Sequence, residues 1–188
     1  MISYEMHPYT LQSYFMNVCK SAYFAHEQLI RVRKDLEKAE TKLTKMKEEL
    51  KNLASPSPEE ELKRRIRRTR KTRKKEKISE HEAKTEILRS DEHFWQWSFQ
   101  NQMYLINNIV SEIIDHNFQI IVTNKEVLFG VMLYFISYER SEEAYQVVNT
   151  NGYFIDFFNK EEMNKEFIEA YFEKNNEKIR TVFFKYFT

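Results

Sequence analysis

The sequence predicts a mainly α-helical protein. Glycine occurs only 2 times and proline only 3 times in 188 residues, which argues against folds that need many tight turns, such as sandwiches, barrels and propellers. Hydrophobic residues make up 41% of the chain and charged residues 31%, so the protein can bury a core. The predicted architecture is a long antiparallel coiled-coil hairpin that projects from a small helical C-terminal domain, with room for one short β-hairpin.

Changes in composition divide the chain into three predicted regions. Residues 1–10 are a lead-in, residues 11–90 form the hairpin with a basic second arm, and residues 91–188 form an acidic, aromatic-rich globular domain. Residues 1–62 carry 9 basic and 10 acidic groups, residues 63–90 carry 13 and 4, and residues 91–188 carry 8 and 15. The net charge of +1 therefore hides a strongly basic segment beside an acidic domain.

An apolar repeat predicts the first arm of the hairpin. Alternating steps of four and three residues from Leu11 to Leu53 meet thirteen apolar residues in succession, which is the spacing of a coiled-coil seam. At about 1.5 Å per residue, a helix from Leu11 to Ala54 is roughly 65 Å long. Because a compact domain of this size is narrower than that, we expect the arm to project.

A short break separates the two predicted arms. Ser55-Pro56-Ser57-Pro58 ends the first helix because each proline lacks an amide donor. Ser57 and Glu60 then fit a capping box for a second helix, with Pro58 at its first position. So short a connection favours an antiparallel hairpin. A fold-back near residue 56 places Glu40 close to Arg73.

In that register, part of the first arm has no apolar counterpart. The seam of the second arm continues from Leu62 and Ile66 into polar or charged residues. These are Thr69, Arg73, Glu76 and Glu80. Opposite them lie Val32, Leu36, Ala39 and Leu43, which together with Met46 form an apolar stripe. Because long apolar patches seldom stay in water, we expect the stripe to bind a second copy of the chain, as a homodimer, or a helix or groove of another protein.

The second arm carries a basic run of eleven cations within fifteen residues, against the single anion Glu76. The cations are Lys63, Arg64, Arg65, Arg67, Arg68, Arg70, Lys71, Arg73, Lys74, Lys75 and Lys77. They surround the whole circumference of a helix and repel one another, so anions must lie nearby. Carboxylates of the first arm, including Glu48 and Glu49 near Arg64 and Arg65, are one source, but four or five acids cannot balance eleven bases.

A second possible source of anions is a binding partner, namely the phosphate backbone of a nucleic acid or ribonucleoprotein. Six to ten phosphate contacts suffice for strong, salt-sensitive binding without sequence information. Such a run equally fits a nuclear localisation signal. An anionic membrane or a calmodulin-type groove would need apolar anchors, which residues 67–77 lack.

Aromatic residues open the C-terminal region. Residues 94–99 read Phe-Trp-Gln-Trp-Ser-Phe and are expected to form a packing hub rather than a platform for stacking on bases. The helix that contains them continues to about Asp115. An amphipathic terminal helix is predicted from about Lys160.

Residues 118–158 leave two alternatives open. Two strands over 118–123 and 127–136 compete with a buried helix over 124–138, capped by Thr123 and Glu126, and the helix is favoured. Asn151-Gly152 indicates either the one β-hairpin or the end of a short helix that begins at Ser141.

No catalytic constellation emerges from the sequence. Its five histidines, His7, His26, His81, His93 and His116, are scattered. Glu112 and His116, with Asp115, are the best metal or acid–base candidates, although such pairs occur readily by chance. The single cysteine, Cys19, is expected to be inert. We therefore expect no enzyme activity, no metal, no cofactor and no small-molecule substrate.

The setting expected from the sequence is the cytoplasm. No signal peptide is recognised, and the longest apolar run, Val127–Ile136, is too short to span a membrane. The chain is expected to be a non-enzymatic nucleic-acid or ribonucleoprotein-binding protein that uses its basic arm. A fitting role is a phage or mobile-element inhibitor of a nucleic-acid-handling machine such as a CRISPR nuclease. The alternative is a structural coiled-coil adaptor or dimerisation protein without nucleic-acid contact.

Overall fold

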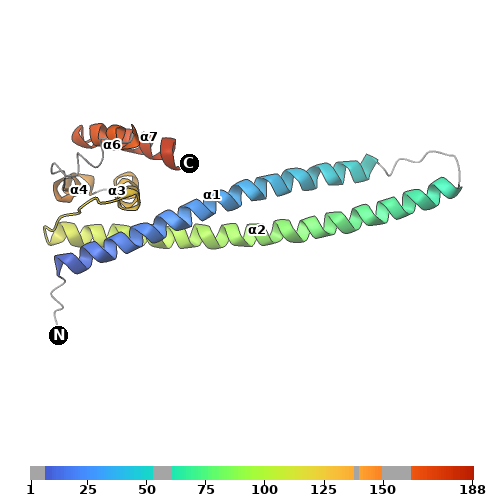
Figure 1. Ribbon diagram of the computed structural model, residues 1–188, viewed down its shortest axis with the longest axis horizontal. Helices are drawn as coiled ribbons and strands as arrows, with labels where there is room; N and C mark the ends of the chain where they lie inside the picture. Colours follow the sequence, from blue (N-terminus) through green and yellow to red (C-terminus); the bar gives the residue numbers. More distant parts are fainter. Residues whose placement is uncertain (1–6, 53–60, 138–139, 150–161) are drawn as a thin grey trace. The chain divides into compact units, whose positions relative to one another are not determined.

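The computed structural model describes residues 7–52, 61–137, 140–149 and 162–188, with the side chains of 61–68 outside this description. Its helices are α1 (Pro8–Asn52), α2 (Glu61–Asp115), α3 (Lys125–Ser137), α4 (Ser141–Val147), α6 (Glu162–Phe172) and α7 (Asn176–Phe187) (Figure 1). The mainly α-helical class is confirmed. The predicted cap at Ser57 and the β-hairpin predicted at Asn151-Gly152 both lie outside the described residues.

The chain forms two compact units. One combines the residues up to Glu27 with Trp97–Thr188, and the other is Gln28–Gln96. The first part of α1 therefore belongs with the C-terminal helices, although the sequence analysis assigned residues 11–27 to the hairpin. The physical reason is that Leu11, Phe15 and their neighbours on the same face of α1 are buried in the C-terminal core.

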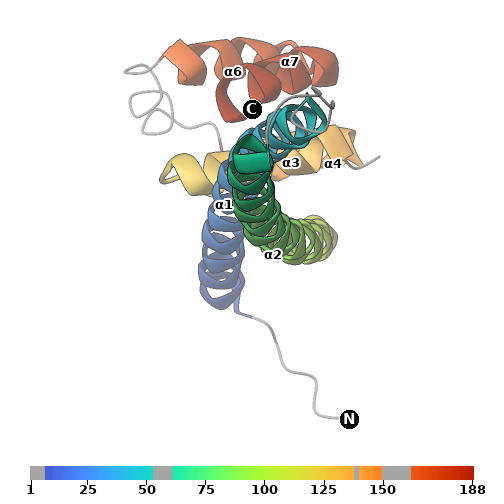
Figure 2. The same cartoon turned by 90° about the vertical axis from the view of Figure 1, so that its right-hand side faces the viewer.

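The core of the first unit is built around α3. Every residue from Val127 to Phe135 is buried, as expected for an apolar helix covered on all sides. Helix α3 packs against α4 and α7, and α6 packs against α7, so that the last two helices lie beside each other (Figure 2). The helix predicted over residues 124–138 is therefore confirmed, and the two-strand alternative is wrong for residues 127–136.

On either side of α3, the structure shows one isolated β-bridge and one short helix. Ile120 forms an isolated parallel bridge with Val148, in which its N–H donates to the Val147 carbonyl at 2.8 Å. A short helix does begin at Ser141. The cap of α3 is Asn124 rather than Thr123, because the Asn124 side-chain oxygen accepts a hydrogen bond from the Val127 N–H at 2.9 Å.

The C-terminal segment contains two helices where one was predicted. Lys174 adopts a left-handed conformation with a φ of 50°. The N–H groups of Lys174 and Asn175 donate to the carbonyls of Tyr171 and Ala170, which is a Schellman closure of α6. Asn175 then caps α7 through its side chain, which accepts from the Lys178 N–H. This turn brings α7 back against α6.

The predicted aromatic packing hub is wrong for two of its members. Phe94 is 55% exposed and Trp97 is 62% exposed. Phe99 lies against the core of the first unit. The main aromatic cluster instead surrounds Phe129, whose ring lies 5.0 to 5.4 Å, centroid to centroid, from those of Phe187, His26, Tyr23 and Phe183.

A histidine ties the first helix to the last one. The Nε2 nitrogen of His26 lies 2.6 Å from the carbonyl oxygen of Phe187. A carbonyl only accepts hydrogen bonds, so Nε2 carries the proton in this contact. The bond satisfies a carbonyl at the end of α7 that has no partner within its own helix. It fixes α7 onto α1 within the first unit.

A glycine permits the closest approach between α1 and α3. A Cβ atom at Gly130 would lie 2.2 Å from the Cys19 Sγ and 3.2 Å from the Cys19 Cβ. Non-bonded carbon and sulfur atoms do not approach so closely, so a larger residue at 130 requires the Cys19 side chain to turn away or α1 and α3 to move apart. Burial raises the pKa of the Cys19 thiol far above its ordinary value, which agrees with the inert thiol that we expect.

Gly130→Ala is expected to destabilise the protein by about 1–2 kcal/mol. Overpacking a core typically costs about 1–3 kcal/mol, and the better helix propensity of alanine offsets part of that. Adding Cys19→Ala removes the clashing sulfur, so the double variant should be more stable than the two single effects predict. Chemical denaturation of the four proteins measures this coupling. Strictly additive effects would contradict the close contact.

A charged pair links α6 to α7. The Lys185 ammonium lies 2.6 Å from the Glu166 carboxylate, and the Tyr186 hydroxyl donates to the same carboxylate oxygen at 3.1 Å. The hydrogen bond from Lys185, helped by that from Tyr186, lowers the pKa of Glu166. A carboxylate with a lowered pKa in the folded state contributes stability above its unfolded pKa and loses it as pH falls through the folded value.

Glu166→Gln is expected to lower the melting temperature at pH 7. The difference from the unchanged protein should shrink as pH falls below about 4.3, the ordinary pKa of glutamate, because the unfolded carboxylate protonates there, and it should be lost once the folded carboxylate protonates at lower pH. Thermal unfolding followed by circular dichroism between pH 7 and pH 3 tests this. A difference that does not depend on pH would assign the effect to packing rather than to charge.

Candidate nucleic-acid interface

Helices α1 and α2 lie side by side and antiparallel within the unit Gln28–Gln96 (Figure 1). Four ion pairs between described side chains join them. They are Arg33–Glu92, Glu40–Arg89 and Lys47–Glu82, each at 2.8 Å, and Glu49–Lys74 at 2.6 Å. As the position on α1 advances, the partner position on α2 falls, which is the order of an antiparallel pair.

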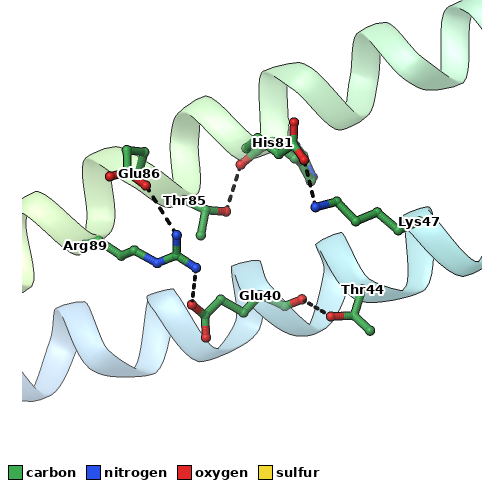
Figure 3. Close-up of polar contacts among 8 residues, drawn as sticks. Glu40, Thr44, Lys47, His81, Thr85, Glu86 and Arg89 are labelled. Atoms are coloured by element: carbon green, nitrogen blue, oxygen red, sulfur yellow. Dashed lines mark hydrogen bonds and ion pairs between the residues drawn. The ribbon is translucent and has the colours of Figure 1, made fainter.

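Figure 3 shows the centre of this contact. The Arg89 guanidinium donates to Glu40 of α1 and to Glu86 of its own helix, and these hydrogen bonds raise its pKa. Next to it, the Thr85 hydroxyl donates to the His81 carbonyl at 2.8 Å. Thr85 is only 1% exposed, so its hydroxyl needs this internal acceptor.

The predicted register of the hairpin is wrong. It placed Glu40 near Arg73 and Glu49 near Arg64 and Arg65, whereas Glu40 pairs with Arg89 and Glu49 pairs with Lys74. The shift arises because the seam of α2 runs through Lys74, Ile78, His81, Thr85 and Leu88, which are buried or half-buried. The predicted seam residues Arg73, Glu76 and Glu80 are exposed instead.

The stripe proposed as a partner surface lies along α1 in this unit. Val32 is 9% exposed, and Leu36, Ala39, Leu43 and Met46 are half-buried. The contacts that bury these side chains come from the same chain. The premise that the stripe has no apolar counterpart in its own hairpin is therefore wrong, because Ile78 and Leu88 of α2 are buried or half-buried along the same contact.

A charge exchange tests this register. Lys47→Glu and Glu82→Lys should each lower the melting temperature, because each replaces an ion pair of 2.8 Å with two like charges that repel. The double variant should regain most of the loss. Melting curves at low and high salt measure the effect, which salt should weaken. Absence of any recovery in the double variant would contradict the observed pairing.

Six cations of the basic run have described side chains. Arg70, Lys71, Arg73, Lys75 and Lys77 are exposed, and Lys74 is half-buried. Of these six cations, only Lys74 forms an ion pair with a described side chain, that of Glu49. The described side chains of α1 and α2 therefore supply these six cations with one ion-paired carboxylate.

The other cations of the run stand on the N-terminal turns of α2. Lys63, Arg64, Arg65, Arg67 and Arg68 lie in this helix, with side chains outside the described residues. Glu49 is only three residues from the end of α1 at Asn52 and already faces Lys74. Helix α2 thus continues beyond the end of α1 (Figure 1), and α1 provides no helical neighbour for these turns.

The Glu112, Asp115 and His116 set does not assemble into one site. The His116 Nδ1 is 3.7 Å from the Glu112 carboxylate and 2.9 Å from the Glu112 carbonyl. Asp115 turns instead to Arg140, at 2.9 Å. Within the described residues, no group of three or more histidine, cysteine, aspartate or glutamate side chains is placed to hold a metal ion. No helix there is long and apolar enough to cross a membrane.

Comparison with known proteins identifies no relative. No protein-family model matches the sequence, and no similar protein is found among curated proteins or solved structures.

Proposed function

We propose that the protein is a non-enzymatic nucleic-acid or ribonucleoprotein-binding protein whose basic run on α2 contacts the phosphate backbone. The proposal depends on one observation, which is that most of the described cations of the run lack an anionic partner among the described side chains. Five exposed cations, Arg70, Lys71, Arg73, Lys75 and Lys77, have no ion pair with any described side chain. We further infer that α1 and α2 of the unit Gln28–Gln96 pack as an antiparallel coiled coil that presents this run.

Phosphate is the anion that best fits this arrangement. Exposed cationic side chains without an ion pair attract mobile counterions to the protein and repel one another. A phosphate backbone brings regularly spaced negative charges and releases its own condensed counterions on binding. Arginine adds paired hydrogen bonds to phosphate oxygens. Contacts of this kind position a protein on a strand without reading the base sequence.

A charge-matched pair of variants tests the proposal. Changing Arg70, Lys71, Arg73, Lys75 and Lys77 to glutamine should weaken binding to a labelled 20-nucleotide DNA or RNA strand by about tenfold or more. It should also flatten the salt dependence, since each lost contact removes about 0.7 from the slope of log K against log salt. The control variant changes Lys34, Lys38, Lys42, Lys45 and Lys51 to glutamine. These five lysines are exposed on α1.

The control has the same net charge and should keep most of the affinity and the slope. Equal losses in both variants would mean that only net charge matters, which contradicts an interface on α2. Unchanged affinity in the run variant would place binding on another surface. A protein that binds neither DNA nor RNA would favour the alternative, a structural coiled-coil adaptor or dimerisation protein. The role as a phage or mobile-element inhibitor stays a prediction.

A further inference from the structure

A groove lies between α1 and α2 where the basic run meets the last turns of α1. Its volume is about 500 Å³. The lining residues are Met46 and Glu49 of α1 and Arg70, Arg73, Lys74 and Lys77 of α2. The four cations follow the spacing i, i+3, i+4 and i+7, which places them on one face of a helix. Four positive side chains therefore line one small hollow together with a single carboxylate.

That carboxylate is held by the least exposed of the four cations. The Lys74 Nζ lies 2.6 Å from the Glu49 Oε2. Lys74 is 21% exposed and Glu49 is 65% exposed, so the anion approaches from the solvent side. The hydrogen bond from Lys74 lowers the pKa of Glu49, which keeps the carboxylate charged. Arg70, Arg73 and Lys77 have no ion pair with any described residue.

We propose that this groove seats one phosphodiester group of a bound nucleic acid, and that the Glu49 carboxylate occupies its place in the free protein. The inference rests on the proposed function and names the point on the basic run where a strand is held. A carboxylate and a phosphodiester both carry one negative charge spread over two oxygens, and both match the donors of arginine and lysine.

A phosphodiester is the stronger occupant of the groove. Glu49 contacts only Lys74 among the lining cations, whereas a phosphate group that enters from solvent is free to use Arg70, Arg73 and Lys77 as well. The side chain of Glu49 is mostly exposed and moves out without disturbing a core. Met46 supplies an apolar wall beside the cations, against which a sugar or base edge can pack. Exchange of one anion for the other thus moderates affinity.

Two neighbouring glutamates provide a matched test. Glu49→Gln removes the internal competitor, while Glu48→Gln removes the same charge from an adjacent, exposed residue. The probe is a fluorescein-labelled, mixed-sequence 20-nucleotide single strand, as DNA and as RNA. Glu49→Gln is expected to raise affinity by about two- to fivefold at low salt, the range expected for release of one exposed ion pair.

The salt dependence should identify the cause. In Glu49→Gln, Lys74 starts without a protein partner, so no internal ion pair that salt also weakens competes with the phosphate, and the slope of log K against log salt becomes steeper. Glu48→Gln should change the slope little. Combining Glu49→Gln with Lys74→Gln should remove the gain, because the cation that the two anions share is then gone. Circular dichroism confirms that each variant keeps its helices.

The outcomes separate the two proposals. If the unchanged protein binds a strand but Glu49→Gln and Glu48→Gln behave alike, the groove is not a phosphate seat, while the function proposed for the run stands. A gain that persists in the absence of Lys74 also overturns the seat. If neither the unchanged protein nor either glutamate variant binds DNA or RNA, both proposals fail.

Discussion

The register between α1 and α2 is the constraint on which the rest of the second unit depends. Ile78 and Thr85 of α2 lie at the buried seam, and the pairs Arg33–Glu92 and Glu49–Lys74 mark the two ends of the contact. In this register α1 ends beside the basic run. Its carboxylates are then used further along α2, as when Glu40 pairs with Arg89. The lack of ion pairs at the exposed, described cations of the run is thus a consequence of helix pairing.

The sequence predicted the local structure well because helices depend on neighbouring residues. The scarcity of glycine and the apolar spacing identified a helical protein, and the helix expected over 124–138 is found at Lys125–Ser137. The register was missed because it depends on pairing between distant residues, and single exposed ion pairs contribute little to it. Counting heptads back from Ile113 and Ile106 reaches Thr85 and Ile78, a signal that starting from Leu62 does not give. The turn at Lys174 has no sequence signal either, since lysine seldom adopts a positive φ.

In the candidate site, too, local features could be predicted from the sequence and features that depend on helix pairing could not. The basic run is a property of composition, so its eleven cations could be named from the sequence alone. The groove could not, because Glu49 and Met46 reach Lys74 only through the observed register. The prediction of an aromatic packing hub was partly wrong because composition shows which residues are aromatic but does not show which way their side chains face. Phe94 and Trp97 are as apolar as Phe99, yet only Phe99 packs against the core.

The contact between Cys19 and Gly130 has a practical consequence. Cys19 is the only cysteine of the chain, and its sulfur lies against the glycine backbone of α3. A thiol-specific reagent cannot reach it until α1 and α3 separate. When reclosing is fast compared with alkylation, the rate of alkylation reports the equilibrium fraction of molecules in which this contact is open. The native cysteine is thus a built-in probe of local opening between α1 and α3, and no label has to be engineered into the protein.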